Sequence, residues 1–181
     1  LPAPLLIPLT ILAAVFGAML WAFFPIMLNI KRNVNIIFSC IMLNYIAKYL
    51  LNFLVQKFPG YVPTSGGSPN IQEAAELPYL ITKPYKISMG VLFSLLCLVA
   101  LYVILFKMRT GYEMRAAGLS RTAAYSAGIA VQKKAVAGML LSGVFTGICA
   151  ALEVMGTTGR VLEDYDPGYM GLGIAIAMLG K

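Results

Sequence analysis

The sequence lacks histidine altogether and contains only three cysteines and seven acidic residues. Without histidine, it cannot form the metal sites or the acid–base pairs that depend on an imidazole ring. The cysteines, Cys40, Cys97 and Cys149, lie far apart, one in each of three apolar runs. That spacing suits neither a disulfide framework nor a metal site, and we interpret the three as small packing residues. We also find no nucleophile–base set and no phosphate-binding loop.

Charge is scarce as well. Charged residues make up 12% of the chain, whereas in a soluble domain they make up about a quarter. Hydrophobic residues make up 60%, and the mean hydropathy is +0.82. The net charge is +7, but the basic residues lie beside apolar runs, so membrane orientation explains them better than binding to nucleic acid. The composition therefore indicates an integral membrane protein with no nucleic-acid partner.

Four apolar runs are long enough to cross a hydrocarbon core of about 30 Å as helices that rise about 1.5 Å per residue. They cover residues 5–28, 36–55, 87–106 and 135–155. We predict an all-α fold, a polytopic helical bundle that forms a single transmembrane domain over residues 1–181. The apolar tail at 168–181 is too short to span. It is either a half-helix that lines a cavity or the beginning of a longer span.

Positive charge is concentrated on one side of this predicted bundle. Lys31 and Arg32 follow the first run, and the other basic residues of that side are Lys107, Arg109, Arg115, Arg121, Lys133 and Lys134. The opposite side has fewer, namely Lys57, Lys83, Lys86 and Arg160. Loops rich in Lys and Arg remain in the cytoplasm. We therefore predict a cytoplasmic segment at 107–134 and an external loop at 57–86, in which Ile71 to Leu80 fits a short interfacial helix.

The cytoplasmic segment contains signals for two short helices. Thr110 and Glu113 fit a capping box, and Gly118 fits a left-handed helix end. Ser120 fits the cap of a second helix that Gly128 would end. Helices of about two turns are not stable alone in water, so they must pack on the membrane helices or on a partner protein. The residues alone leave a plain connector and a docking surface equally open.

The second apolar run carries polar side chains at every fourth position, on one helix face: Asn44, Lys48, Asn52 and Gln56. A lysine inside a span costs about 2.5–3.5 kcal/mol on insertion scales, so this face should meet protein or water. For Lys48 we favour an amine that extends outward to the membrane surface. The alternative is that Asn44, Lys48 and Asn52 line a polar path.

The fourth apolar run carries two rows of small residues. One row is Gly138, Ser142, Thr146 and Ala150, and the other is Gly143, Gly147 and Ala151. Such rows allow helix backbones to approach closely, so we interpret them as packing surfaces.

Ordered motifs over about residues 20–181 resemble those of a known family. The pattern T-x-G…R-A-x-G…A-A…G-I resembles Thr110-Gly111, Arg115 to Gly118, Ala123-Ala124 and Gly128-Ile129. It is typical of inner-membrane permeases of bacterial ABC importers for simple sugars and nucleosides, relatives of the branched-chain amino-acid permeases. Later motifs of this family are similar to Leu141-Ser142-Gly143 and Ile174 to Gly180. The nucleoside branch has a stretch that resembles Val34 to Ala47, where Ile36 replaces a Glu and Cys40 a Thr.

The resemblance implies a multi-pass permease subunit of an ATP-binding-cassette importer in the bacterial inner membrane. Such a subunit is not an enzyme and forms a path for a nucleoside or simple sugar, whose identity the sequence leaves open. It needs no cofactor of its own, because ATP and Mg are bound by a separate ATPase. The implied partners are ATPase subunits, a second permease subunit, an extracytoplasmic substrate-binding lipoprotein and membrane lipid. Family permeases have more spans, so we expect this chain to be a fragment that lacks both ends of a larger permease.

The resemblance also implies that residues 107–134 couple the permease to the ATPase. The expected coupling residues are Arg115, Ala116, Gly118, Arg121, Ala123, Ala124, Tyr125 and Gly128. Of these, we expect Arg115 and Arg121 to make polar contacts with the ATPase and Tyr125 to be a buried aromatic anchor. The alternative for both arginines is an ordinary position beside lipid headgroups. Two other functions remain open: a secondary transporter or channel that uses the face of Asn44, Lys48 and Asn52, or a membrane scaffold.

Overall fold

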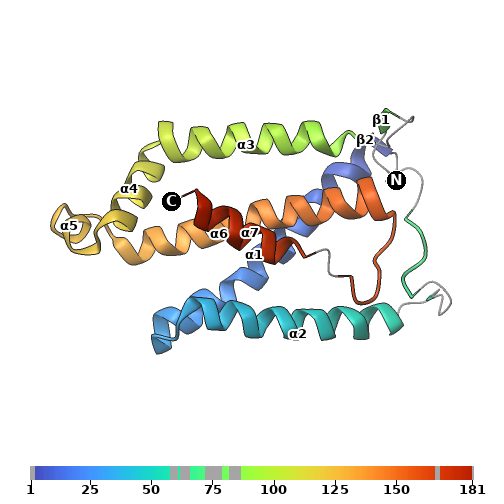
Figure 1. The fold of residues 1–181 in the computed structure, drawn as a ribbon, viewed down its shortest axis with the longest axis horizontal. Coiled ribbons are helices and arrows are strands. Elements are labelled where there is room, and N and C mark those ends of the chain that lie inside the picture. The colour runs from blue at the N-terminus through green and yellow to red at the C-terminus, as the bar shows by residue number, and fades with distance from the viewer. Residues whose placement is uncertain are drawn as a thin grey trace.

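The computed structural model describes residues 3–57, 61, 66–71, 79–81, 87–165 and 168–180. Its helices are α1 (Ala3–Arg32), α2 (Ile36–Lys57), α3 (Gly90–Lys107), α4 (Arg109–Leu119), α5 (Arg121–Ser126), α6 (Val131–Glu153) and α7 (Tyr169–Leu179). A π-helical turn, η2 (Val154–Thr158), extends α6, and the strands β1 (Tyr79–Ile81) and β2 (Ile87–Ser88) form an antiparallel pair. The predicted polytopic helical fold is confirmed (Figure 1).

Four helices among the described residues are long and apolar enough to cross a membrane: Leu6–Arg32, Ile36–Lys57, Gly90–Lys107 and Val131–Thr158. Figure 1 shows α4 and α5 at one end of the bundle and the β1–β2 pair at the opposite end. The first and last of these helices extend beyond the apolar runs. This occurs because polar and charged residues continue these helices beyond the apolar runs, Asn29 to Arg32 at the end of α1 and Gln132 to Lys134 at the start of α6.

Three asparagines between residues 29 and 35 determine where α1 ends and α2 begins. Asn33 adopts a left-handed conformation with φ +50° directly after α1, a conformation that asparagine tolerates. The side chain of Asn29 donates to the carbonyl of Val34 at 2.8 Å, and Asn35 Oδ1 accepts from the backbone N–H of Ile37 at 2.9 Å. These amides close one helix and begin the next within a few residues.

The interfacial helix predicted for Ile71 to Leu80 is wrong for the residues at its ends. Ile71 lies in irregular backbone, and Tyr79 and Leu80 belong to β1, which pairs with β2. The residues between them, 72–78, lie outside the described residues, as do Lys83 and Lys86. Because Ile87 and Ser88 form β2, α3 begins at Gly90 rather than at residue 87.

The most extensive contact between two helices joins α1 and α6. Gly143, Gly147 and Ala151 are all buried, so one of the two predicted rows of small residues forms this contact. A Cβ added at Gly147 would lie 2.6 Å from the Cα of Val15, and one at Gly143 would lie 3.2 Å from the Cβ of Ala22. By contrast, nothing lies within 4 Å of the equivalent position at Gly138. The two helix backbones therefore touch along the row of Gly143, Gly147 and Ala151.

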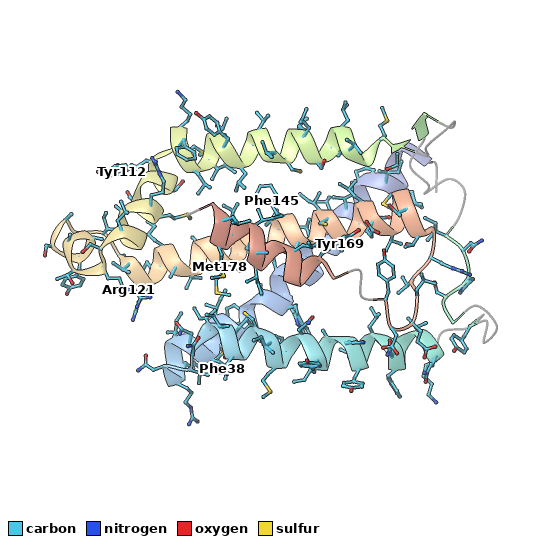
Figure 2. All side chains as sticks on the ribbon, in the orientation of Figure 1. Phe38, Tyr112, Arg121, Phe145, Tyr169 and Met178 are labelled. Atoms are coloured by element: carbon cyan, nitrogen blue, oxygen red, sulfur yellow. The ribbon has the colours of Figure 1, made fainter. Side chains whose placement is uncertain are left out.

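Elsewhere the apolar side chains point outward (Figure 2). The described apolar side chains that are buried form a short set: Ile26, Val55, Ala124, Ala151 and Met155. Large side chains such as Phe16, Ile37 and Leu98 are mostly exposed. Such an apolar surface is unfavourable in water and favourable in lipid or against further protein. The chain is accordingly a multi-pass membrane protein.

We predict that Gly147→Ala destabilises the bundle by about 1–3 kcal/mol, because the added methyl group overlaps the backbone of α1. Thermal unfolding in detergent measures the effect. Gly138→Ala is the matched control, and it should unfold at the wild-type temperature or slightly above. Equal losses of stability in the two variants would contradict the assigned helix contact.

Candidate functional site

The segment 107–134, which is predicted to be cytoplasmic, contains two helices, α4 and α5, at one end of the bundle (Figure 1). Met108 has extended backbone angles and separates α3 from α4, and Ser120 separates α4 from α5. The hydroxyl of Ser120 accepts from the N–H of Ala123 at 3.3 Å, and Gly128 has φ +78° after α5. The predicted cap at Ser120 and the predicted end at Gly128 are therefore confirmed.

Two local predictions in the same segment are wrong. Helix α4 begins at Arg109 after Met108 and has no side-chain cap, so Thr110 lies inside the helix and forms no capping box with Glu113. Gly118 does not have a positive φ, and α4 continues through Leu119 until the extended backbone of Ser120 ends it. Both signals were local, whereas the beginning of α4 is set by its contact with α3.

That contact depends on Gly111. A Cβ at Gly111 would lie 2.1 Å from the carbonyl oxygen of Ile104 and 2.5 Å from the Cα of Leu105. Backbone therefore meets backbone where α4 crosses the last turns of α3. The guanidinium carbon of Arg115 lies 4.5 Å from the ring centroid of Phe106, which adds a cation–π contact between the same two helices.

Glu113 connects α4 to the first turns of α6. Its carboxylate lies 2.5 Å from Lys134 Nζ and 3.1 Å from Arg109 Nε. The side chains of Glu113 and Lys134 are only 19% and 21% exposed. The hydrogen bond from Lys134, followed by the charges of Lys134 and Arg109, lowers the pKa of Glu113 below its ordinary value. The carboxylate therefore remains ionised at neutral pH and joins α4 to α6.

The remaining predicted coupling residues divide into packed and exposed groups. Ala124 is buried and Ala116 is half-buried, whereas the exposed members are Gly118, Arg121, Ala123, Tyr125 and Gly128. Tyr125 is 79% exposed, so it is not buried within this chain. Leu119, which sequence reasoning missed, is 89% exposed. Figure 2 shows Arg121 at this end of the molecule, where it also lines a cavity of about 640 Å³ between α1, α4 and α6.

At the opposite end, the polar face of α2 binds the loop that follows η2. We call residues 159–165 the external latch, because they lie on the side that the charge distribution predicts to be external. Lys48 Nζ lies 3.1 Å from Asp164 Oδ1, and Asn52 donates to the same oxygen at 3.2 Å. The backbone N–H of Asp164 in turn donates to Asn52 Oδ1 at 3.1 Å. The neighbouring Glu163 accepts from the side chain of Gln56.

The external latch also pairs with residues 66–71 of the external loop. The backbone N–H of Ser68 donates to the carbonyl of Val161 at 2.9 Å, and the backbone N–H of Glu163 donates to the carbonyl of Gly66 at 2.7 Å. Tyr61 donates its hydroxyl to Glu163 Oε2 at 2.9 Å. The latch therefore joins α2, the external loop and the end of α6.

The interpretation that the Lys48 amine extends outward stays a prediction. The amine pairs with Asp164 of the latch, which is 116 positions later in the chain. Lys48 and Asn52 both contact the latch, and nothing in the structure assigns them, or Asn44, to a path; that role stays a prediction. The sequence showed the polar face of α2 but not the loop that meets it, since the partners are more than a hundred residues apart.

We predict that the external latch loosens in acid. The hydrogen bonds from Lys48 and Asn52 lower the pKa of Asp164, so the pair is present above the ordinary aspartate pKa of about 4 and is lost as pH falls through the lowered value. Asp164→Asn should imitate this loss at neutral pH. Hydrogen exchange of the amides of residues 159–165 should accelerate in that variant.

Lys57→Gln, which removes an exposed charge at the end of α2, is the control and should leave the exchange unchanged. Wild-type exchange rates in Asp164→Asn would contradict the latch.

Comparison with known proteins gives one family and several relatives. The family described as "Branched-chain amino acid transport system / permease component" matches residues 2–181. The guanosine ABC transporter permease protein NupP of Bacillus subtilis is 32% identical over 99% of this chain and 52% of its own length. The glucose ABC transporter permease protein TsgB13 of Haloferax volcanii is 30% identical over 100% of the chain and 50% of its own length. The nucleoside ABC transporter permease protein NupB of Lactococcus lactis is 26% identical over 99% and 52%.

The chain spans about half the length of these curated relatives. No solved structure matches it.

Proposed function

Because the chain belongs to the family of branched-chain amino acid transport system permease components, we propose that it is a permease subunit of an ATP-binding-cassette importer. Its substrate is a nucleoside or simple sugar, which is supported by relatives described as permeases for guanosine, nucleosides and glucose. The subunit performs no bond chemistry. ATP and Mg belong to a partner ATPase, and the full importer also contains a second permease subunit and an external substrate-binding lipoprotein.

The observation that best supports coupling to an ATPase is the exposed tip of the α4–α5 pair. Leu119 and Tyr125 are 89% and 79% exposed at the basic end of the bundle. Large apolar side chains in contact with water favour burial in a partner, and aromatic and arginine residues dominate the binding energy of protein interfaces. Arg121 lies beside them in sequence and is also exposed. We assign Leu119, Arg121 and Tyr125 as the ATPase-binding tip.

The same end of the molecule is built to transmit movement. Helix α4 meets α3 through Gly111 and through the contact between Arg115 and Phe106. It is joined to α6 by the ion pair between Glu113 and Lys134. A displacement of the tip therefore moves α3 and α6 together, which is the rigid-body motion that alternating access requires. We call these contacts of α4 with α3 and α6 the α4 joint. Arg115 contributes to the α4 joint through Phe106, so its expected contact with the ATPase is not needed for the proposal.

We predict that Arg121→Ala combined with Tyr125→Ala weakens ATPase binding roughly 30-fold or more, as expected for interface hot spots. Co-purification of the assembled transporter in detergent measures the loss. Tyr112→Ala is the matched control, since Tyr112 is 63% exposed on α4 but outside the tip. Undiminished ATPase binding in the double variant would refute the assigned surface.

We predict a different result for Glu113→Gln. This variant removes the charge that joins α4 to α6 but leaves the tip exposed, so the ATPase should still bind while less substrate is transported per ATP hydrolysed. Uptake and ATP hydrolysis measured together in proteoliposomes give that ratio. Lys133→Gln controls for loss of a neighbouring exposed charge. If Glu113→Gln abolished ATPase binding instead, Glu113 would be a residue that contacts the ATPase and not part of the α4 joint.

The competing function, a secondary transporter or channel on the face of Asn44, Lys48 and Asn52, has no support in the comparisons. In the structure Lys48 and Asn52 contact the external latch. Uptake that follows an ion gradient and ignores ATP depletion would nevertheless favour it over the importer.

A further inference from the structure

Glu153 is an acid in the last turn of α6, within an otherwise uncharged apolar stretch. It is half-buried, and its Oε1 accepts from the hydroxyl of Tyr165 at 2.6 Å and from that of Tyr169 at 3.4 Å. The hydrogen bond to Glu153 raises the pKa of Tyr165 to about 12, so the phenol remains a donor at neutral pH. Acidic residues within membrane helices are costly and usually mark a pathway or a binding site.

Both tyrosine bonds use the same carboxylate oxygen. Among the described residues, Oε2 of Glu153 accepts no hydrogen bond. An ionised carboxylate has about four lone-pair sites, so at least half of its capacity remains for another donor. The tyrosines hold the carboxylate in position and leave one oxygen for a ligand.

That carboxylate lines a cavity between α3 and α6. The cavity has a volume of about 300 Å³, at the lower limit of pockets that bind small molecules. Its other polar lining residues are Ser88, Ser94 and Thr157, together with the thiols of Cys97 and Cys149, and Phe145 contributes an aromatic face. The Ser94 hydroxyl already donates to the carbonyl of Val91 at 2.8 Å, so the Glu153 carboxylate is the strongest acceptor of this lining. A carboxylate beside apolar side chains and an aromatic ring suits a neutral, hydroxylated molecule with one flat or apolar side.

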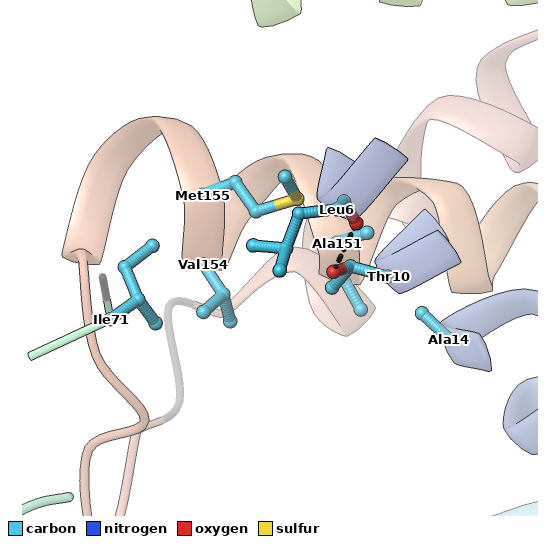
Figure 3. A pocket seen from close by; sticks show the side chains of 8 residues that line it. Leu6, Thr10, Ala14, Ile71, Ala151, Val154 and Met155 are labelled. Atoms are coloured by element: carbon cyan, nitrogen blue, oxygen red, sulfur yellow. Dashed lines mark hydrogen bonds between the residues drawn. The ribbon is translucent and has the colours of Figure 1, made fainter. Parts of the chain in front are cut away.

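A second cavity gives a useful contrast (Figure 3). It has a volume of about 560 Å³ and lies between α1 and the end of α6. Its lining is apolar except for Thr10, whose hydroxyl already donates to the carbonyl of Leu6 at 2.8 Å. Among the described residues that line it, none offers a charged acceptor, so it does not suit a hydroxylated ligand.

We propose that Glu153 is a substrate contact of the permease, and that its Oε2 accepts hydrogen bonds from vicinal hydroxyls of the transported molecule. This proposal rests on the proposed import function and adds the site and the recognised chemistry. The shared feature of the candidate ligands is the vicinal diol, present on the ribose of a nucleoside and on a simple sugar. A carboxylate also repels phosphate, so the site selects nucleosides over nucleotides.

The position of Glu153 fits such a contact. Tyr165 is the last residue of the external latch, and Tyr169 begins α7, so the carboxylate lies where the external segments meet α6. A ligand on Glu153 would therefore meet the protein at the outer end of the α3–α6 cavity, beside the latch that joins α2 to the same region.

Cys149 provides a direct test, because it lines the cavity and is exposed. In the assembled transporter in lipid, with Cys40→Ala and Cys97→Ala, the rate of labelling of Cys149 by a thiol reagent is measured with guanosine, 2′,3′-dideoxyguanosine or glucose. At about ten times its Kd, a bound diol should slow labelling about tenfold, since only about a tenth of the sites remain unoccupied. The dideoxynucleoside should not protect Cys149 from labelling, because it lacks the diol. Protection by guanosine but not glucose would indicate a nucleoside as the substrate, and the reverse result would indicate a sugar.

Glu153→Gln should abolish the protection, and Tyr165→Phe should weaken it by releasing the carboxylate, with thermal unfolding confirming that both variants fold. In the control variant Lys57→Gln, whose substitution lies outside the cavity, the ligand should protect Cys149 as in the wild type. Absence of protection by either diol, equal protection by the dideoxynucleoside, or unchanged protection in both variants would overturn the proposal. Because labelling needs no ATP, ATP-driven uptake without protection would refute only the site, and protection without ATP-driven uptake would refute the importer.

Discussion

The close contact between α1 and α6 is the constraint on which the rest of the structure depends. Gly147 and Gly143 allow the two backbones to touch, and a side chain at Gly147 would overlap the backbone of Val15. In a membrane, helix association gains little from the hydrophobic effect, since lipid is as apolar as the helices. Close van der Waals packing between backbones takes its place. This packing fixes the position of α6 against α1, and segments at both ends of the protein are joined to α6.

At the end predicted to be cytoplasmic, α6 receives the ion pair of Glu113 with Lys134, which positions α4 and hence the proposed ATPase-binding tip. At its outer end it leads through η2 into the external latch. Among the described residues, Glu113 and Asp164 each pair with a lysine from another element, Lys134 and Lys48. Glu153 differs from them, because it lies inside the last turn of α6 and accepts from two tyrosines.

Sequence reasoning succeeded where a signal was local or periodic. The cap at Ser120 depends on one hydroxyl and one backbone N–H three residues later, and the helical membrane fold depends on the length of the apolar runs. It failed where a contact between distant segments prevailed over a local motif. Thr110 and Glu113 have the spacing of a capping box, but Glu113 instead pairs with Lys134 from the next long helix.

The sequence by itself therefore determined the membrane class, the helical fold, the end of the bundle that is rich in basic residues and the family resemblance, because these depend on composition and on patterns along the chain. Only the tertiary structure decided which row of small residues packs, which acid meets Lys48, and that Leu119 and Tyr125 are exposed together. It alone also placed Tyr165 and Tyr169 on one oxygen of Glu153. Each of these depends on how helices and loops pack, which no single stretch of sequence specifies.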